Sequence, residues 1–319
     1  MAELQVSSGI AARDALCAAF DSARHHIRAE FYRITDPRII ASLNDAAARG
    51  VDVRIELEGA PDRYHRGVRD KSKPVRAVDA IAEARARFSP LVHVDVSLDP
   101  IVLLHAKAAV VDGRQALVAT ANQTPSGCYS PGSVVVSDSN ASDVVALRDA
   151  LSRKDEECGA HLLAGPGVAL RSNLQPLFAS DADLNIAVED LSDPQIVEEL
   201  EARRGNGHAD RILLDACKKV SVTEARTIRE LEHCGVAVRA LPKQYMHEKY
   251  VDAGTEIYVG SANLTHNGLD EAREVAIIAA PDCFADGAKS LRNEFESNWA
   301  LARPIKLRGC VAQALETAA

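Results

Sequence analysis

Apolar positions recur along the chain in two kinds of pattern, one with the spacing of a helix and one typical of a strand. Segments of the two kinds follow one another, so helices and strands are predicted to alternate. Apolar residues recur at helical spacing over residues 10–24, and a β-branched and aromatic run follows over residues 27–34. Residues 35–48 are predicted to be a helix, because they open on a capping Asp followed by Pro. The apolar run at residues 51–57 completes a β-α-β unit, which predicts a parallel strand pair.

The same pattern occurs a second time. Residues 184–191 match residues 27–34, and Ser192-Asp193-Pro194 matches Thr35-Asp36-Pro37, both at an offset of 157 residues. A constant offset across a whole β-α-β unit is hard to obtain from residue propensities alone, so it indicates an internal duplication. Each copy is expected to continue with a helix (75–88; 222–234), a strand (91–96; 236–241), a later strand (133–137; 274–279) and an amphipathic helix (141–158; 283–301).

These elements predict an α/β fold made of two duplicated halves. Each half is expected to be a mixed β-sheet flanked by helices, the first at residues 1–158 and the second at residues 159–319. The connecting segment 159–167 is short and holds few flexible polar residues. We therefore expect the halves to pack together as a pseudo-dimer.

Composition agrees with two globular halves. The chain has 319 residues, 47% of them hydrophobic, which is enough for two cores. Charged residues interrupt the apolar residues of the first twenty positions, and no apolar run is long enough to span a bilayer, so neither a secretory signal nor a transmembrane segment is expected. The seven cysteines contain no Cys-x-x-Cys pair, which argues against a disulfide framework and a zinc knuckle. We expect reduced thiols and a cytoplasmic protein.

One segment concentrates positive charge in an otherwise acidic chain of net charge −9. The overall charge disfavours a wholly basic nucleic-acid-binding protein but leaves room for a local basic surface. Residues 61–76 are polar and contain Gly and Pro, so they form either a solvated loop or a loop that contacts phosphate. The candidate substrate-binding residues there are Arg63, Arg66, Arg69, Lys71 and Lys73.

The chemistry centres on a His-x-Lys pair that occurs once in each half. His105 and Lys107 form the first pair, and His247 and Lys249 form the second. An Asn closes the next apolar run in both halves, 17 residues after the first His (Asn122) and 16 after the second (Asn263). Residues two apart on a strand share a face, so each pair presents an imidazole beside an ammonium. Two such pairs at matching places are not well explained by chance.

These residues suit phosphoryl transfer. Two Lys and two Asn side chains can surround the non-bridging oxygens of a phosphodiester and stabilise their charge. One neutral imidazole can attack phosphorus to form a phosphohistidine, while the other, protonated, serves the leaving oxygen. Glu274, 27 residues after His247, could orient one imidazole; its counterpart in the first half is Ser133, so the two halves are not equivalent.

These motifs resemble the signature of the phospholipase D superfamily, His-x-Lys-(x)4-Asp followed by Gly-Ser-x-x-Asn. The first copy has the full spacing from His105 to Asp112 but Ala119-Thr120 in place of Gly-Ser. The second copy has Gly260-Ser261 and its Asn, but only two residues between Lys249 and Asp252. A loss of two residues keeps the same side chains on the same face of a strand.

The resemblance covers nearly the whole chain and carries several expectations. Residues 27–57 and 295–299 are similar to the small bacterial endonucleases of that superfamily, which pair two single-motif subunits. This chain looks like their fused form, which favours a monomer. The resemblance implies a phospholipase D-like fold, His105 as nucleophile, His247 as general acid, and no required metal or cofactor. The motif positions that it implies to be structural are Asp112, Asp252, Thr120 and Ser261.

We therefore expect a metal-independent phosphodiesterase. Nucleic acid is slightly favoured as substrate, because aromatic residues make up only 4% of the chain and interfacial enzymes usually offer aromatic or amphipathic anchors. The alternatives are a phospholipase D or phosphatidyltransferase that acts on phospholipid headgroups, and an enzyme for a small soluble phosphodiester. A non-catalytic phosphate-binding module is a further alternative, against which the retention of both histidines argues.

Overall fold

The computed structural model describes residues 4–59, 64–65, 68–69, 82–99, 101–153, 155–166, 169–215 and 222–305. The strands are β1 (Leu4–Ser8), β2 (His26–Phe31), β3 (Asp52–Glu58), β4 (Tyr64–His65), β5 (Val68–Arg69), β6 (His93–Ser97), β7 (Lys107–Val111), β8 (Gln115–Ala119), β9 (Val134–Asp138), β10 (Glu157–Cys158), β11 (Leu162–Gly165), β12 (Asn185–Val188), β13 (Arg211–Leu214), β14 (Ala237–Ala240), β15 (Lys249–Asp252), β16 (Ile257–Gly260), β17 (Glu274–Ala279) and β18 (Arg303–Pro304). The α-helices are α1 (Ile10–Ser22), α2 (Pro37–Ala48), α4 (Pro125–Cys128), α5 (Ala141–Arg153), α6 (Ala169–Phe178), α7 (Pro194–Gly205), α8 (Val222–His233) and α9 (Gly287–Leu301).

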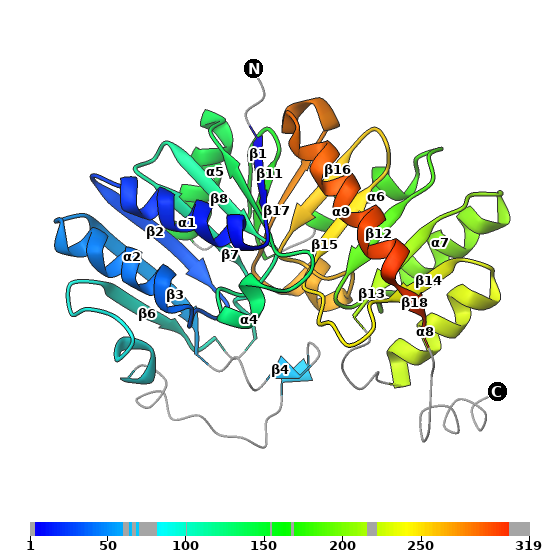
Figure 1. Cartoon of the computed structure of the whole chain (residues 1–319), viewed down its shortest axis with the longest axis horizontal. Coiled ribbons are helices and arrows are strands. Elements are labelled where there is room, and N and C mark those ends of the chain that lie inside the picture. Colours follow the sequence, from blue (N-terminus) through cyan, green and yellow to red (C-terminus); the bar gives the residue numbers. More distant parts are fainter. Residues whose placement is uncertain are drawn as a thin grey trace.

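Two large sheets stand side by side (Figure 1). The first has seven strands in the order β1-β9-β8-β7-β2-β3-β6, and the second has nine in the order β10-β11-β17-β16-β15-β12-β13-β14-β18. The block β9-β8-β7-β2-β3-β6 has the same topology as β17-β16-β15-β12-β13-β14, with the last three strands of each block parallel and the others antiparallel. The predicted α/β fold with two duplicated mixed sheets is confirmed.

The two β-α-β units begin their helices in the same way. The carboxylate of Asp36 accepts hydrogen bonds from the backbone N–H of Arg38 and Ile39, at 3.0 and 3.2 Å. The carboxylate of Asp193 accepts one from the N–H of Ile196 at 3.2 Å. Proline follows both caps, where its missing N–H and fixed φ suit the first helical turn. This local chemistry is why the sequence predicts the starts of α2 and α7 correctly.

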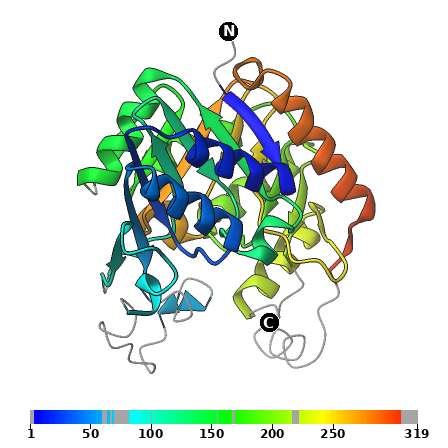
Figure 2. The same cartoon turned by 60° about the vertical axis from the view of Figure 1, so that its left-hand side comes forward.

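The described residues form three apolar cores. One lies between α1, α2 and the outer face of the first sheet, and Figure 2 shows these two helices side by side in front of that sheet. A second lies between α6, α7, α8 and the outer face of the second sheet. The third joins both inner faces and includes Val118, Leu147, Val259 and Phe295. A fully buried Leu or Phe side chain contributes about 1.5–3 kcal/mol, so the third core stabilises the association of the halves.

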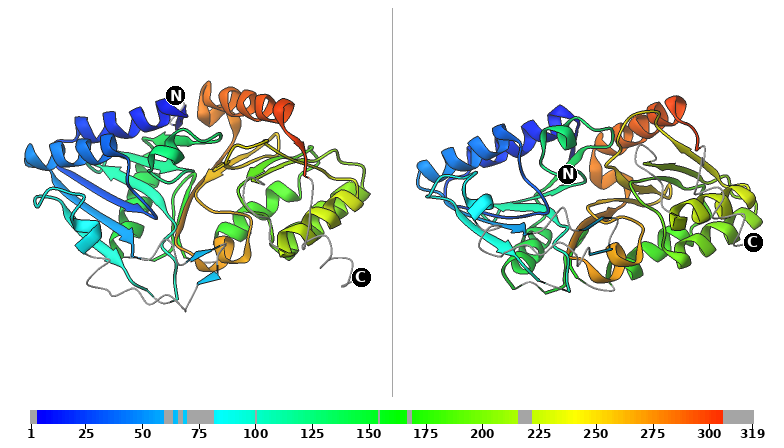
Figure 3. Two further views of the ribbon diagram at one scale, coloured as in Figure 1. Left: turned by 60° about the horizontal axis from the view of Figure 1, so that its bottom comes forward. Right: turned by 90° about the horizontal axis from the view of Figure 1, so that it is seen from below.

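The last helix of each half also contacts the sheet of the other half. Helix α5 of the first half packs on β10 and β11 of the second sheet, and α9 of the second half packs on β1 of the first sheet. Gly287 at the start of α9 lies so close to β1 that a Cβ atom there would approach a Val6 side-chain carbon at 2.5 Å. Figure 3 shows α9 on the same side of the molecule as α1 and α2. The predicted pseudo-dimer is therefore observed.

A buried ion pair and backbone bonds link the halves beside the first His-x-Lys pair. Arg273, just before β17, pairs with Glu30 of β2, and both side chains are buried. The backbone N–H of His105 donates to the carbonyl of Arg273 at 3.0 Å, and the N–H of Arg273 donates to the carbonyl of Leu103 at 2.8 Å. The second half thus helps to place His105.

Several element boundaries differ from the sequence predictions. The helix predicted over residues 141–158 ends at Arg153, and residues 157–158 form β10, which pairs with β11 inside the segment expected to be a linker. The helix predicted from residue 283 begins at Gly287, because Pro281–Phe284 forms a 3-10 turn. The first half of the helix predicted over residues 75–88 lies outside the described residues. In the part that is described, residues 82–85 are helical.

Among the described residues, no helix is both long and apolar enough to cross a membrane.

Candidate active site

The two His-x-Lys pairs enter the two sheets at equivalent points and face the same region. Lys107 begins β7 and Lys249 begins β15, and each histidine lies two residues earlier. The backbone N–H of His105 donates to the carbonyl of Arg273 in the second half at 3.0 Å, and that of His247 donates to the carbonyl of Pro131 in the first half at 3.3 Å, so both pairs lie where the halves meet. The pseudo-dimer interface brings together residues that the sequence separates.

The imidazole of His105 is held by a carboxylate from the opposite half. Its Nδ1 lies 2.7 Å from Oε1 of Glu274, and the other oxygen of Glu274 accepts a hydrogen bond from the hydroxyl of Ser261. Burial alone would raise the pKa of Glu274, but His105, Lys107 and Ser261 together lower it. Glu274 is therefore an anion that accepts the Nδ1 proton, which leaves Nε2 of His105 with its lone pair. Burial, reinforced by Lys107, lowers the pKa of His105, so the ring is neutral near pH 7.

The imidazole of His247 has a different carboxylate. Its Nδ1 lies 3.2 Å from Oε2 of Glu189, and the same oxygen accepts a hydrogen bond from Nζ of Lys249 at 3.0 Å. The hydroxyl of Tyr245 donates to Oε1 of Glu189, and its ring lies edge-on to the imidazole at a centroid distance of 4.4 Å. Burial lowers the pKa of His247 to about 4, with Glu189 opposing the shift.

Sequence reasoning missed Glu189. The offset of 157 residues aligns it with Tyr32, whose ring contacts His105 edge-on at 5.0 Å, so comparison of the two copies gives no matching acid. The sequence offered only the position of Glu189 near the end of a predicted strand. The structure adds that it directly follows β12, whose last residue, Val188, pairs with Lys249.

Both lysines are fully buried, and each folds back on its own motif. Nζ of Lys107 donates to the carbonyl of His105 at 2.6 Å, and Nζ of Lys249 donates to the carbonyl of His247 at 3.1 Å. Burial lowers the pKa of Lys107 to about 7. Since a buried ammonium costs several kcal/mol unless anions compensate it, two of them at one place indicate a site for a negatively charged ligand.

The two asparagines carry unsatisfied polar atoms at equivalent places. The side-chain oxygens of Asn122 and Asn263 are buried and have no hydrogen-bond partner within the described part of the chain. Buried polar atoms are nearly always paired in folded proteins. Rotation of the amide group by half a turn exchanges its oxygen and its nitrogen. Each asparagine is therefore able to offer its N–H groups to a ligand oxygen.

A matching loop supports each asparagine, and this loop was not predicted. The hydroxyl of Thr124 accepts a hydrogen bond from the N–H of Gly127 at 3.0 Å, and that of Thr265 accepts one from Gly268 at 3.1 Å. A Cβ atom on Gly127 or Gly268 would lie 2.1 or 2.6 Å from the backbone oxygen of the asparagine in the same loop. The pattern Asn-x-Thr-x-x-Gly, present in both copies, was the sequence signal.

The other motif residues form hydrogen bonds and ion pairs that join neighbouring elements. The carboxylate of Asp112 accepts hydrogen bonds from the backbone N–H groups of residues 24, 25 and 26 at 2.8–2.9 Å, and that of Asp252 pairs with Arg292 of α9 at 2.7 Å. The hydroxyl of Thr120 accepts from the N–H of Val134, and that of Ser261 accepts from the N–H of Val275, both at 2.9 Å.

Most of the predicted basic segment lies outside the described residues. Arg63, Arg66, Lys71 and Lys73 lie outside the described residues, and for Arg69 only the backbone, in β5, is described. The β4–β5 hairpin lies beneath the junction of the two halves in Figure 1, and near that junction in Figure 3.

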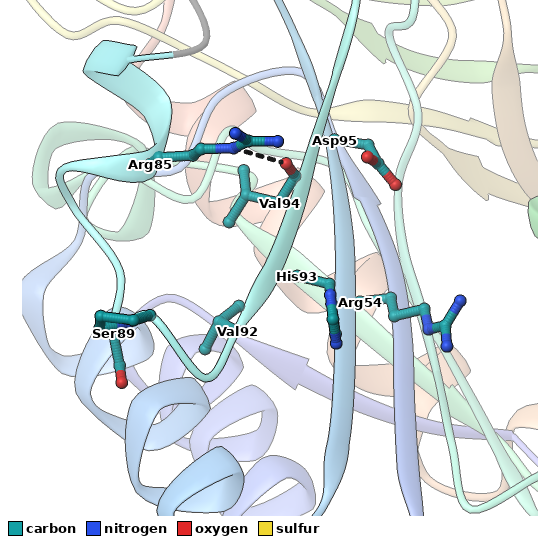
Figure 4. Close-up of a pocket in the computed structure, with 8 residues that line it drawn as sticks. Arg54, Arg85, Ser89, Val92, His93, Val94 and Asp95 are labelled. Atoms are coloured by element: carbon teal, nitrogen blue, oxygen red, sulfur yellow. Dashed lines mark hydrogen bonds between the residues drawn. The ribbon is translucent and has the colours of Figure 1, made fainter.

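A pocket of about 480 Å³ lies elsewhere, at the outer edge of the first sheet (Figure 4). Its polar lining includes Arg54, Arg85, His93 and Asp95, and Nε of Arg85 donates to the carbonyl of Val94 at 3.5 Å. Strand β6, which forms one wall, stands three positions from β7 in the sheet. This pocket is separate from the His-x-Lys pairs.

Two groups of His and Asp side chains among the described residues have the spacing of metal ligands, and neither includes the His-x-Lys pairs. One is Asp193, His266 and Asp270, but Arg171 already bonds both carboxylates. The other is Asp138, Asp143 and His161, in which Asp143 accepts the backbone N–H groups of residues 161 and 162 and so anchors the start of β11.

The family model described as "Cardiolipin synthase, PLD-like domain" matches residues 16–152 and 175–299. The fold is similar to that of phosphatidylserine synthase from Haemophilus influenzae Rd KW20, with a TM-score of 0.73 and 13% identity over 99% of this chain and 92% of that chain. It is also similar to polyphosphate kinase from Porphyromonas gingivalis, with a TM-score of 0.63 and 17% identity over 90% of this chain but only 44% of that chain. Nuc from Salmonella typhimurium, a phospholipase D family member, aligns over 44% of this chain and 93% of its own, with 16% identity and a TM-score of 0.39. At these identities the structural likeness establishes the fold alone. A comparison with curated protein sequences finds no match.

Proposed function

The chain belongs to the phospholipase D superfamily through its PLD-like domain, and on that premise we propose that it is a metal-independent phosphodiesterase that acts through a phosphohistidine. The observation that carries the proposal is the pairing of two imidazoles, that of His247 buried and that of His105 14% exposed, each with its own carboxylate near Nδ1. Two buried lysines accompany them, and the amide oxygens of the two motif asparagines have no hydrogen-bond partner among the described residues. Structural ion-pair networks also contain buried charges, but buried polar atoms in folded proteins are nearly always paired, so the unsatisfied atoms favour a functional site.

In the proposed reaction, Nε2 of His105 attacks phosphorus while the bond to the leaving oxygen breaks. His247 gives its proton to that oxygen, and then takes one from the incoming water or alcohol, which displaces His105. Lys107, Lys249 and the two asparagines stabilise the non-bridging oxygens. Glu274 holds the nucleophile in the tautomer with a free Nε2.

The charges of the site support this division of roles. With both imidazoles neutral, the two lysines balance the carboxylates of Glu189 and Glu274. A bound phosphodiester adds one negative charge, which favours the uptake of one proton by the buried site. That proton converts His247 into the acid that the first step needs.

Nucleic acid is our first proposal for the substrate, supported by the concentration of cationic residues in segment 61–76 and by the low aromatic content. A phospholipid headgroup is the second, supported by the description of the matching family model and by the full-length likeness to a phosphatidylserine synthase. Both substrates contain the phosphodiester that the site suits. Transfer to an alcohol uses the same phosphohistidine as hydrolysis.

The proposal is tested by assaying the purified protein in EDTA against single-stranded DNA, duplex DNA, RNA and phosphatidylcholine vesicles, the last with and without added ethanol. We expect cleavage of one class to continue undiminished in EDTA. Cleavage of vesicles alone would assign the second substrate, and phosphatidylethanol would identify transfer. A requirement for added magnesium would contradict the mechanism.

The pH profile of kcat/KM should be bell-shaped with an unusually low alkaline limb. Lys107 has its pKa lowered from 10.5 to about 7, and His247 has its pKa lowered from 6.5 to about 4, so the free site loses the proton of His247 near pH 4 and that of Lys107 near pH 7. The value of kcat/KM therefore begins to fall above pH 4 and falls further above pH 7, and it falls on the acid side as His105 becomes protonated. A bound phosphate favours the protonated forms, so the alkaline limb of kcat should lie higher. An alkaline limb of kcat/KM near pH 10 would refute this expectation.

A further inference from the structure

The two histidines obtain their carboxylates from positions that the duplication does not relate. Equivalent backbone bonds align the halves around Glu274: Thr120 N–H donates to Val134, as Ser261 N–H does to Val275. On the other side, His105 N–H donates to Arg273, as His247 N–H does to Pro131. Between these anchors the second half has Glu274 alone, whereas the first half has Gly132 and Ser133. The carboxylate expected opposite His247 is therefore missing.

An acidic side chain does not fit at Gly132. Gly132 has a φ of +73°, and a Cβ atom on it would approach Cβ of Glu248 at 2.1 Å. The backbone N–H of Gly132 donates to a carboxylate oxygen of Glu294 at 3.1 Å. The segment is fitted closely to the second half at Gly132, and its other residue is Ser133, so in this chain the carboxylate beside His247 comes from a different element.

Glu189 provides for His247 the carboxylate that Glu274 provides for His105, but it lies on a different element. It follows β12 in the same half as His247, and its side chain is 14% exposed. One of its oxygens lies 3.2 Å from Nδ1 of His247 and accepts a hydrogen bond from Nζ of Lys249, which itself lies 3.2 Å from the same Nδ1, and the other oxygen accepts from Tyr245. Together these contacts fix the position of the carboxylate.

We propose that Glu189 is the positioning residue of the general acid: it holds the Nδ1 proton of His247 and so directs Nε2 toward the leaving oxygen. The inference rests on the proposed function and assigns to that site a residue that the duplicated motif lacks.

The surroundings of the two carboxylates explain how two identical side chains take different roles. Glu189 shares its charge with an ammonium 3.0 Å away, so less of it supports a proton on His247. Glu274 receives a neutral hydroxyl from Ser261, so His105 has a stronger anionic partner. His247 is then the better proton donor and His105 the better nucleophile.

Bis(p-nitrophenyl) phosphate separates this role from a general loss of structure, because p-nitrophenolate leaves without protonation. In Glu189→Gln we expect a pre-steady-state burst of p-nitrophenolate with unchanged amplitude and nearly unchanged rate. Steady-state turnover, which needs His247 to take a proton from water, should fall on the order of 10²-fold. A dialkyl phosphodiester should lose kcat by a similar factor with little change in KM.

Glu274→Gln is the matched control, since it removes the carboxylate of the nucleophile. It should slow the burst itself. Equal slowing of burst and turnover in Glu189→Gln, or no slowing of either, would overturn the role of Glu189 while leaving the proposed function intact. If the wild type releases no p-nitrophenolate and cleaves no other diester, the proposed function fails and the inference with it. Glu189→Asp, which keeps the charge, should recover part of the turnover.

Discussion

Replacing His105 with alanine is expected to lower phosphodiester turnover by at least on the order of 10⁴-fold, because it removes the atom that forms the covalent bond to phosphorus. Lys107, Lys249 and the asparagines would still bind the phosphate, so KM for the diester should change little. The first step is lost as well as the second, so no burst of p-nitrophenolate should appear. Quenched-flow measurement of the burst checks this directly.

The control for this substitution is His233→Ala, which removes an exposed histidine at the end of α8. It should retain full activity. A burst of normal amplitude in His105→Ala would show that another side chain is the nucleophile, and His247 would be the first candidate.

Replacing His247 with alanine should separate the two chemical steps. Loss of the general acid costs about 10²–10⁴-fold on a diester whose leaving group needs a proton. With bis(p-nitrophenyl) phosphate the first step should survive, but the phosphohistidine should persist because no base activates water. One equivalent of p-nitrophenolate per protein, followed by little further release, is the expected result.

The His247→Ala variant offers a second readout, because removal of a buried imidazole leaves a cavity of that shape. Added imidazole should restore part of the second step, since it can take the proton from water. Immediate multiple turnovers without added imidazole would argue against the role of His247.

The parts of the fold that the sequence predicts are those set by local chemistry. The capping side chains of Asp36 and Asp193 act on N–H groups two or three residues away, so the starts of α2 and α7 can be predicted from neighbouring residues. The end of α5 could not be predicted in this way. Residues 157–158 leave the helix to pair with β11, and β11 depends in turn on β17, more than a hundred residues later.

The site residues also differ in whether the sequence alone could predict them. The duplication identifies His105 and His247 with their lysines, because both copies retain the spacing. Glu274 is predicted as an orienting acid from its place after His247, although its counterpart in the first half is Ser133; which imidazole it contacts depends on how the halves dock. Glu189 is not predicted because the pseudo-symmetry fails there, and only the contact of β12 with β15 places it beside His247.

The phosphohistidine is the central claim, and its location can be measured. Wild type and His247→Ala are mixed in EDTA with a diester labelled at phosphorus, quenched within the burst, and digested under alkaline conditions that preserve phosphohistidine. Mass spectrometry of the peptides should place the labelled phosphoryl group on His105, with a higher occupancy in His247→Ala. Label on His247, or turnover by the wild type with no labelled histidine in either protein, would contradict the mechanism.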